Sequence, residues 1–509
     1  MDMTAPDFTV AVVGAGPSGI VTGIKLKQAG IQDFTILERA DDVGGSWHSN
    51  TYPAICADSP GLAYQYSFLK NRNWTRFFPK GAEVRDYHVR AARQYGLYPH
   101  LQFGKHVVGQ KWDAAQRFWN LRLANGETIT ARFLITAVGV FVDPVTEPDI
   151  AGLDEFAGVV QRTASWQHAH RHEGKRVAVI GTGASAVQIV PALAPDAAVV
   201  DVYQRTPVWC LPKPDFDLTS GLARVLRSRR LVGFLHGIGL AFFDLMLRLA
   251  AVLPKPVAKV LLVGFDLSAR AAYSLVLLRA VQDPAVRQLL RPRFGLVVKR
   301  PVLSNSFLQT FNRANTNLIT EPIERLTRTG IRTTAGVDRT YDMIVLATGF
   351  VVFIDPRAYP PGTIVGRDDA DLGTLFATRG MQAYEGLSVP GFPNRWMIVG
   401  PYSWTGTGWH SAAELAADHT VRIIKETLRR GADVAEVTQA AHDRYHRAVQ
   451  RNGRNIELYY KEINGGTRTY YVNTQGEVAY IRPGSFLRAI WGGRYSPVNH
   501  YRYTGAQGG

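Results

Sequence analysis

Two glycine-rich loops, each placed directly after an apolar run typical of a β-strand, constrain this chain more than any other feature. Residues 14–19 read Gly-Ala-Gly-Pro-Ser-Gly, and residues 181–186, about 165 positions later, read Gly-Thr-Gly-Ala-Ser-Ala. Glycines in such a loop allow a tight turn and a close approach to a pyrophosphate, which the N-terminus of the following helix attracts. One loop is a weak signal, whereas two predict two dinucleotide-binding units of the α/β class.

The side chains that follow the next strand differ in charge between the two units. Glu38 ends the apolar run 34–37 after the first loop, where a carboxylate can bind a ribose 2′-hydroxyl. The run 199–203 after the second loop is followed by Gln204, Arg205 and Thr206. A cation and a hydroxyl at this point suit a 2′-phosphate. We therefore expect the second unit to bind NADPH rather than NADH.

Length and cysteine content bound the class of protein. A chain of 509 residues with 46% hydrophobic content should form two or three domains with large cores. Cys56 and Cys210 are the only cysteines, which excludes a disulfide framework, a CxxC redox pair and a cysteine zinc site. The histidines show no metal-ligand spacing, so no metal is expected. The first strand starts by residue 8 and leaves no room for a secretion signal, so a cytoplasmic location is expected.

Two further apolar strands suggest how the domains are assembled. Residues 133–139 end in Ala-Val-Gly and residues 343–350 contain a similar Ala-Thr-Gly ending, so the chain is expected to cross between two domains twice. The first dinucleotide domain should comprise residues 1–143 and 345–509. The second should comprise residues 144–210 and 297–344, and residues 211–296 should form a helical insertion. From about residue 464 the Tyr- and Gly-rich tail has strand character.

The positive charge of the chain is concentrated in one segment. The formal net charge is +16, and residues 221–300 contain fourteen Lys and Arg against three Asp. This field attracts anions, but the segment is apolar and has no nucleic-acid reading motif, so no nucleic acid is expected. Residues 231–253 resemble a membrane span, which His236, Asp244 and Arg248 disfavour. A soluble helical subdomain over the active site is favoured, and peripheral membrane contact through residues 221–295 stays open.

Several motifs resemble the flavin-dependent Baeyer-Villiger monooxygenases of the two-dinucleotide type, which are related to the flavin-containing and N-hydroxylating monooxygenases. The match covers nearly the whole chain. Its first part includes Gly-Gly-Ser-Trp at 44–47, Tyr52, and Asp58 at the spacing of the family's active-site aspartate. Its later parts include Lys-Arg-Pro at 299–301, the segment that carries the family's catalytic arginine, and the strand 344–350.

This resemblance implies two Rossmann-like domains, with FAD at the first loop and NADPH at the second, and an inserted helical subdomain. It also implies a reaction in which reduced FAD and O₂ form a C4a-peroxide that converts a hydrophobic ketone to an ester or lactone. Anionic charge develops during that reaction, and an arginine is a fixed cation that can stabilise it. We expect Arg300 to fill this role and Asp58 to hold its guanidinium in place.

The remaining expected site residues follow from the two loops and the resemblance together. The residues expected to contact the cofactors are Gly14, Gly16, Ser18, Gly19, Glu38, Gly45, Ser46, Trp47, Tyr52, Asp58, Tyr64, Gly181, Thr182, Gly183, Ala184, Ser185, Arg205, Thr206, Lys299, Ala347, Thr348 and Gly349.

Three positions depart from the family pattern. The family fingerprint places a histidine where this chain has Arg162, between Phe156 and Trp166. That histidine sits in a linker that couples NADPH binding to domain movement, so Arg162 puts coupling in doubt more than chemistry. Tyr470 stands where relatives often carry an active-site tryptophan, and Ala54 stands where the Tyr-Pro motif usually continues with glycine.

Three other functions compete with ketone oxidation. A monooxygenase that oxidises nitrogen or sulfur needs the arginine less, so Asp58 with Lys299 and Arg300 argues against it. A flavin disulfide reductase would need paired redox cysteines, which the chain lacks. A catalytically degenerate, membrane-associated flavoprotein is kept open by Arg162. The sequence identifies neither the ketone nor the oligomeric state.

Overall fold

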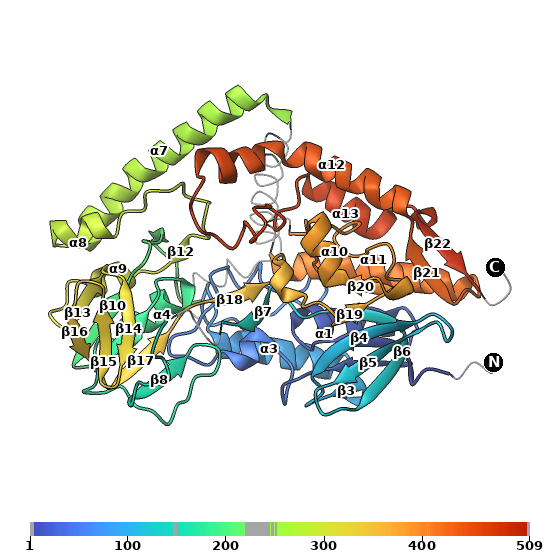
Figure 1. Cartoon of the computed structure of the whole chain (residues 1–509), viewed down its shortest axis with the longest axis horizontal. Helices are drawn as coiled ribbons and strands as arrows, with labels where there is room; N and C mark the ends of the chain where they lie inside the picture. The colour runs from blue at the N-terminus through green and yellow to red at the C-terminus, as the bar shows by residue number, and fades with distance from the viewer. Residues whose placement is uncertain are drawn as a thin grey trace.

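The two glycine-rich loops follow strands in two separate sheets, one in each lobe of the molecule (Figure 1). The computed structural model describes residues 5–145, 150–218, 245, 249, 252–404, 406 and 408–505. In the first sheet the described strands follow the order β19-β4-β5-β6-β1-β2-β3, with β20 beside β6. Their bounds are β1 Phe8–Val13, β2 Phe34–Leu37, β3 Leu101–Gln102, β4 Val107–Asp113, β5 Phe118–Leu123, β6 Thr128–Thr136, β19 Ile364–Val365 and β20 Arg395–Met397.

Helices cover the parallel part of the first sheet, which explains why its strands are apolar without alternation. All four residues of β2 are buried, and β1 is buried over its last four residues. Helix α1 (Pro17–Gln28) begins within the first glycine-rich motif with a proline at its start, a position where the missing N–H costs nothing. Helix α11 (Trp409–Arg429) packs against α1, so the C-terminal part of the chain returns to the first domain.

The second sheet is parallel throughout, in the order β13-β10-β9-β17-β8. Helix α4 (Ala184–Leu193) follows its glycine-rich loop. Strands β13 and β17 come from beyond the insertion, so the chain does return to this domain. β17 extends two residues past the expected boundary at 344, and the exact domain limits stay a prediction. The strands are β8 Val159–Arg162, β9 Arg176–Ile180, β10 Val199–Tyr203, β13 Thr316–Ile319 and β17 Met343–Leu346.

The insertion leaves and re-enters the second domain at one place. Strand β11 (Cys210–Leu211) pairs in parallel with β12 (Val302–Leu303), which joins the two ends of the insertion. Between them, helix α7 (Lys255–Ala280) forms an arch at the edge of the molecule and leads to α8 (Pro284–Leu289) (Figure 1). Most of the span-like segment 231–253 lies outside the described residues.

The tail beyond residue 464 differs from the expectation of strands, which was wrong for most of it. Residues 464–485 are largely irregular, and helix α13 (Phe486–Tyr495) follows. Only β22 (Tyr501–Thr504) is a named strand, paired with β21 (Val434–Val437). The reason is that the tail's tyrosines pack as a cluster of rings against the interior of the molecule rather than alternating across a sheet.

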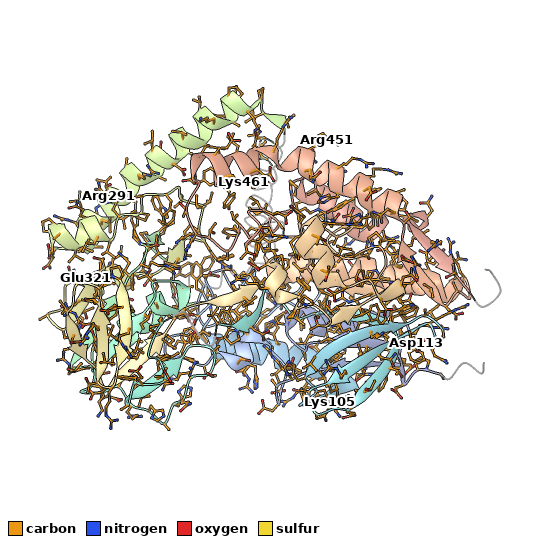
Figure 2. All side chains as sticks on the ribbon, viewed as in Figure 1. Lys105, Asp113, Arg291, Glu321, Arg451 and Lys461 are labelled. Atoms are coloured by element: carbon orange, nitrogen blue, oxygen red, sulfur yellow. The ribbon has the colours of Figure 1, made fainter. Side chains whose placement is uncertain are left out.

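The remaining described elements connect the two lobes and cap them. Helix α12 (Gln439–Glu457) continues into a π-helical turn, η4 (Leu458–Ile463), which lies beneath α7 and carries Lys461 (Figure 2). The other elements are α2 Ser46–Ser49, α3 Gly81–Gln94, η1 Tyr98–His100, β7 Phe141–Pro144, α9 Phe307–Thr310, β14 Ile323–Thr327, β15 Gly330–Thr333, β16 Asp338–Thr340, β18 Phe350–Val352, η2 Pro356–Ala358, η3 Arg367–Asp369, α10 Leu372–Arg379 and η5 Val498–His500.

Candidate active site

One connected cavity of about 3550 Å³ is lined by residues of both glycine-rich loops. Pockets for single small ligands usually have volumes of roughly 300–1,000 Å³, so this cavity has room for more than one large ligand. Every residue expected in the site lines it except Gly19. The fold therefore brings together side chains that are separated by up to about 335 positions in the chain.

The first loop is closely packed, and its glycines are required by their neighbours. A Cβ on Gly14, which has φ +101°, would lie 2.8 Å from the carbonyl oxygen of Ala137. A Cβ on Gly19 would lie 1.8 Å from the carbonyl oxygen of Gly14. Gly19 therefore allows the helix to pack closely on Gly14 and does not itself line the cavity. A Cβ on Gly45 would lie 2.9 Å from the Cα of Gly16. Gly45 therefore packs closely against the loop.

The same loop presents the groups that a dinucleotide needs. Gly16 caps α1 without a side-chain hydrogen bond, and the first turn has no acidic residue, so its N–H groups are available to a phosphate. The buried carboxylate of Glu38 accepts hydrogen bonds from the backbone N–H of Ala15 at 2.6 Å and of Ala40 at 2.8 Å. These bonds hold Glu38 at the cavity wall, where the sequence placed a ribose. The residues present fit the FAD that was expected here.

The second loop repeats this plan but is more open. Gly181 has φ +119°, and a Cβ on it would lie 2.5 Å from the carbonyl oxygen of Ala347. Ala347 therefore supports the second loop as Ala137 supports the first. In contrast, a Cβ on Gly183 would have no atom within 4 Å. Gly183 caps α4, again without a side-chain hydrogen bond or an acidic first turn, so this helix N-terminus also faces the cavity freely.

Two cations stand beside the second loop. Lys299 and Arg205 both line the cavity, and burial, followed by the charge of Arg205, lowers the pKa of Lys299. No carboxylate of the described residues forms an ion pair with either. Thr182 donates a hydrogen bond of 3.0 Å to the carbonyl oxygen of Thr206 and so positions the adjacent backbone. A pair of cations without an acidic partner fits the 2′-phosphate of NADPH, as the sequence predicted.

Arg300 and Asp58 form the ion pair that the resemblance implied. The guanidinium of Arg300 donates to the carboxylate of Asp58 at 2.6 Å, and 42% of the Arg300 side chain faces the open cavity. Burial by itself would lower the pKa of Arg300. The charge of Asp58, with contributions from Tyr470, Tyr471 and Tyr480, outweighs burial and leaves that pKa above its ordinary value. Arg300 is therefore a permanent cation in the cavity.

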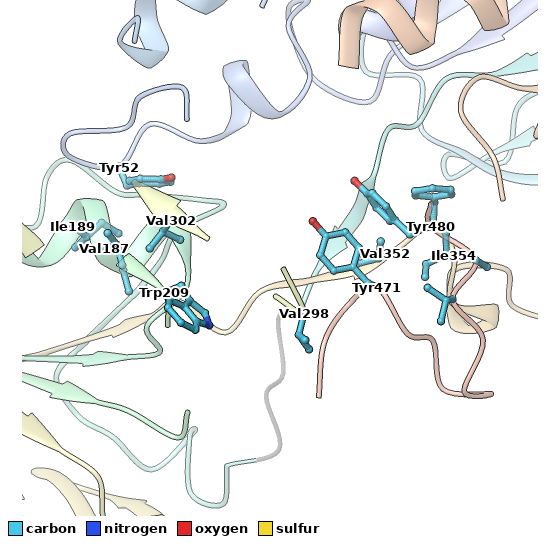
Figure 3. Packing of buried hydrophobic residues seen from close by; sticks show 14 of the residues in the cluster. Tyr52, Val187, Ile189, Trp209, Val298, Val302, Val352, Ile354, Tyr471 and Tyr480 are labelled. Atoms are coloured by element: carbon cyan, nitrogen blue, oxygen red, sulfur yellow. The ribbon is translucent and has the colours of Figure 1, made fainter. Parts of the chain in front are cut away.

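Three tyrosines of the tail line the cavity with this pair and contribute to the pKa of Arg300, and the sequence singled out only one of them, Tyr470. The rings of Tyr470 and Tyr471 are 4.5 Å apart, and those of Tyr471 and Tyr480 are 5.0 Å apart. The hydroxyls of Tyr471 and Tyr480 point the same way (Figure 3). Burial raises the pKa of all three, so they stay neutral beside Arg300. The tyrosine-rich tail was a visible signal, but nothing local marked Tyr480.

Trp47 and Tyr64 form an aromatic pair on the part of the cavity wall near the ion pair. Trp47 donates its indole N–H to the hydroxyl of Tyr64 at 3.0 Å, and the two rings meet edge to face. Burial raises the pKa of Tyr64 to about 12, and the charges of Asp58 and Arg300 also act on it. Trp47 and Tyr64 therefore form a neutral aromatic part of the cavity wall that also holds Asp58 and Arg300.

Gln188 links the two domains and was missed by the sequence reasoning. Its side-chain oxygen accepts hydrogen bonds from the Tyr52 hydroxyl at 3.2 Å and from the Cys56 N–H at 3.3 Å, and its NH₂ group donates to the Cys56 carbonyl at 3.1 Å. Gln188 belongs to α4, the helix of the second loop. It therefore ties that helix to the segment that ends in Asp58.

The three departures from the family pattern also have defined places. Arg162 ends β8 and lies opposite Leu346 of β17, one residue before Ala347, which supports the second loop. Its effect on coupling stays a prediction. Tyr470 lies in the ring cluster that lines the cavity with Arg300. Ala54 has φ +61° in a turn closed by a hydrogen bond from Ile55 N–H to the Tyr52 carbonyl. A proline followed by a positive φ is the type II pattern, which favours glycine at Ala54.

Two helix N-termini and an arginine–aspartate pair that line one cavity are typical of oxidoreductases that bind two dinucleotides. Residues 11–220 match the family model described as pyridine nucleotide-disulphide oxidoreductase. The chain is 40% identical over 451 residues to an uncharacterized monooxygenase of Mycobacterium bovis, covering 88% of each protein. It is 34% identical over 479 residues to a Baeyer-Villiger monooxygenase of Pseudomonas aeruginosa, covering 93% of this chain and 87% of that protein.

Solved structures agree with these relatives. A crystal structure of OTEMO in complex with FAD and NADP matches with a TM-score of 0.83 and 25% identity, covering 98% of this chain and 100% of that one. Oxidized steroid monooxygenase bound to NADP matches with a TM-score of 0.81 and 26% identity, covering 98% and 99%. The chain belongs to the family of FAD- and NADPH-dependent Baeyer-Villiger monooxygenases. It is a flavoprotein monooxygenase with two Rossmann-like domains.

Proposed function

We propose that this enzyme uses NADPH and O₂ to convert a hydrophobic ketone into an ester or lactone. The observation that carries the proposal is the Arg300–Asp58 ion pair, which lies in the cavity that both dinucleotide loops line. Relatives named Baeyer-Villiger monooxygenase support the same reaction. Nitrogen or sulfur oxidation is the alternative, and none of the contacts among the described site residues favours it.

The two loops assign the cofactors. FAD would lie with its pyrophosphate at the N-terminus of α1 and a ribose at Glu38, and Trp47 and Tyr64 would flank its ring system. NADPH would lie at the N-terminus of α4, with its 2′-phosphate between Arg205 and Lys299. When bound, the flavin reduced by NADPH supplies, together with O₂, the oxidant of the reaction. The protein contributes position, charge and exclusion of water.

Arg300 performs the electrostatic part of the reaction. Negative charge develops on the carbonyl oxygen of a ketone as its carbon is attacked, and a fixed cation in a water-poor site stabilises that charge strongly. Its raised pKa keeps Arg300 protonated across the working pH range. Asp58 holds the guanidinium through its 2.6 Å bond and leaves the rest of the group exposed to the cavity.

Aromatic and aliphatic side chains make the cavity beside Arg300 suited to an apolar substrate. Tyr470, Tyr471 and Tyr480 present their rings on one side, and Phe353 packs against Tyr480 at 5.5 Å. A ketone with a hydrophobic body would bury that body here and keep its carbonyl at the guanidinium. This arrangement supports a hydrophobic ketone as the substrate class.

The test is to purify the enzyme, confirm bound FAD by its absorption spectrum, and measure NADPH consumption against a panel of ketones, sulfides and amines. Products are identified by mass spectrometry. We expect esters or lactones, and a loss of ester formation by a factor of about 10²–10³ in Arg300→Ala, the range seen when one transition-state donor is removed. FAD content should not change. Asp58→Asn should show a smaller loss.

Arg332→Ala is the matched control, because Arg332 forms an ion pair with Asp338 at 2.8 Å on the surface, away from the cavity. It should keep full activity. Sulfoxide or hydroxylamine products that Arg300→Ala forms at an undiminished rate would contradict the proposal. A parent enzyme that binds FAD but consumes no NADPH with any compound would favour the degenerate flavoprotein.

A cytoplasmic location is part of the proposal. Cys56 and Cys210 are both free thiols, and Cys210 is buried, which suits a reducing compartment. Peripheral membrane contact through residues 221–295 also belongs to the proposal, and the described part of that segment supports it.

A further inference from the structure

Helix α7 has far more exposed apolar surface than a helix of a soluble domain needs. Among the described helices, it alone is long and apolar enough to cross a membrane by length and composition, with a mean hydropathy of 1.6 over its most apolar window. Only Ala258, Asp266, Tyr273, Leu277 and Ala280 are buried among its 26 residues. These five positions follow helical spacing and form one narrow stripe, which packs on η4 and α9.

The face opposite that stripe is apolar along the helix. At about 100° per residue, Val260, Leu267, Leu275 and Leu278 point away from the buried stripe. Their side chains are 72%, 57%, 58% and 57% exposed. The helix forms the outer edge of the molecule, and side chains project from that edge into open space (Figures 1 and 2). A helix that is apolar on both its inner and outer faces is typical of contact with lipid or with another protein.

Polar contacts on the inner face hold α7 along the protein surface, so it does not span a bilayer. The buried carboxylate of Asp266 accepts hydrogen bonds from the Tyr459 hydroxyl at 2.8 Å and from the Leu296 N–H at 3.1 Å. Arg270 donates to the carbonyl oxygen of Arg293 at 3.0 Å. A helix tied to the protein by one side can enter a membrane only with its other side, and only as far as the interfacial region.

Charge decides which occupant this surface fits. Residues 252–300 contain nine Lys and Arg against two Asp, and one of those two, Asp266, is buried. Lys255, Lys259 and Arg279 are exposed on α7 itself. A second copy of a chain with net charge +16 would bring like charges together, whereas an anionic lipid surface would attract them. Apolar side chains bordered by cations are the pattern of an interfacial helix.

The same helix borders the active-site cavity. Ala258, Leu261, Leu262 and Phe265 line that cavity, together with Tyr459 of η4. Leu261 and Phe265 are also exposed at the surface of the molecule. One end of α7 therefore separates the cavity from the outer apolar face by the thickness of a single helix.

From these observations we propose that the outer face of α7 docks on an anionic lipid surface. The part of the cavity wall that α7 forms then lies at the lipid interface, where a lipophilic substrate would enter. Docking is independent of the reaction, and only the entry route rests on the proposed ketone oxidation.

The test is sedimentation of the FAD-loaded enzyme with vesicles made of equal parts phosphatidylcholine and phosphatidylglycerol, and with vesicles of phosphatidylcholine alone. We expect binding to the anionic vesicles that weakens at high salt. The triple variant Val260→Glu, Leu267→Glu, Leu275→Glu should bind at least about ten-fold more weakly, because three charges would enter the apolar interface. Lys259→Glu with Arg279→Glu should weaken binding to anionic vesicles in particular.

The matched control is Leu487→Glu with Trp491→Glu on α13, where both side chains are similarly exposed, at 62% and 51%. This variant should bind vesicles as the parent does. None of the substituted α7 residues lines the cavity, so each variant should keep its FAD spectrum, its thermal midpoint and its rate with a short, water-soluble ketone. A long-chain ketone presented in vesicles should react several-fold more slowly with the triple variant.

Two results would overturn the proposal. One is a parent enzyme that does not sediment with anionic vesicles and is a dimer by light scattering, with the triple variant a monomer, since the occupant would then be a second copy. The other is equal vesicle binding by the parent and the triple variant. If no ketone reacts at all, the proposed reaction fails, but sedimentation still decides whether α7 docks on lipid.

Discussion

The two dinucleotide loops have the same plan but different surroundings. In the first, Gly19 lies against Gly14 and Gly45 lies against Gly16, so close that a single Cβ would collide with backbone. In the second, a Cβ on Gly181 would also collide with backbone, but Gly183 has no atom within 4 Å of where its Cβ would be, and Gly183 and Ala184 are exposed. The first loop is closed over by residues 44–47, and the second has no corresponding cover among the described residues.

This difference matches what the two cofactors must do. A cofactor that stays through every turnover gains from a closed, pre-formed site, because less freedom is lost on binding. A cofactor that delivers a hydride and is replaced needs a site that it can leave. The packing therefore suggests a permanent site at the first loop and an exchangeable site at the second.

The largest expected effect comes from alanine at the two loop glycines. Gly19→Ala should abolish FAD binding or folding, because its Cβ would lie 1.8 Å from the carbonyl oxygen of Gly14. Gly183→Ala should fold and retain FAD, and its KM for NADPH should rise, because the methyl would occupy space that the pyrophosphate approaches. Flavin absorbance per protein and steady-state kinetics measure both. Loss of FAD in Gly183→Ala would break the contrast.

The second largest effect is expected from the two cations of the second dinucleotide site. Arg205→Ala and Lys299→Ala should each raise the KM for NADPH by roughly 10- to 100-fold, since a hydrogen bond to a charged group contributes about 1.5–3 kcal/mol. The KM for NADH should hardly change, because NADH lacks the 2′-phosphate. Arg313→Ala, an exposed cation of the same domain outside the cavity, is the control. An equal effect on both coenzymes would place the two cations elsewhere.

A smaller effect is expected from pH. The pKa of Lys299 is lowered, so its charge is present at low and neutral pH and is lost as pH rises, earlier than for an ordinary lysine. kcat/KM for NADPH should therefore fall on the alkaline side. In Lys299→Arg the fall should move to higher pH, because arginine keeps its proton. A profile that is unchanged by Lys299→Arg would show that another group titrates. FAD retention should not follow this profile.

The smallest effect is expected at Ala54, in the turn between Tyr52 and Cys56, the two residues that bond to Gln188. Ala54 has φ +61°, which costs an L-residue about 1–2 kcal/mol and glycine nothing. After the greater flexibility of unfolded glycine is subtracted, Ala54→Gly should stabilise the fold by about 0.5–1 kcal/mol. Thermal unfolding measures it. Ala448→Gly, inside helix α12, should destabilise by about 1 kcal/mol. Destabilisation by Ala54→Gly would contradict the assignment of strain.

The site residues that the sequence predicts best are those whose roles depend on neighbouring positions in the chain. Gly14, Glu38 and Gly181 follow strands within short strand–turn–helix units, so their roles could be predicted from spacing alone. Arg300 and Asp58 are 242 positions apart and were paired only through the resemblance to a family. Gln188 and Tyr480 were missed, because each acts through a contact with a distant segment and neither lies in a recognisable motif.

The insertion is a second region where the sequence alone could not predict the arrangement. Composition located an apolar, basic segment and left open whether it was soluble or interfacial. The structure shows that α7 buries one stripe on η4 and leaves the other face exposed, with Asp266 turned inward. Exposure is a property of what packs around a helix, and the order of residues does not contain it.

By itself, the sequence determined two dinucleotide units and the acid and cation that distinguish them, because those signals are local and need only strand, turn and helix geometry. The class of redox chemistry was predicted only through the resemblance to a family. Only the tertiary structure decided that the first loop is closed and the second open, that three tyrosines line the cavity with Arg300, and that α7 borders both the cavity and the outside. Those features arise where distant segments pack, and packing depends on the whole fold.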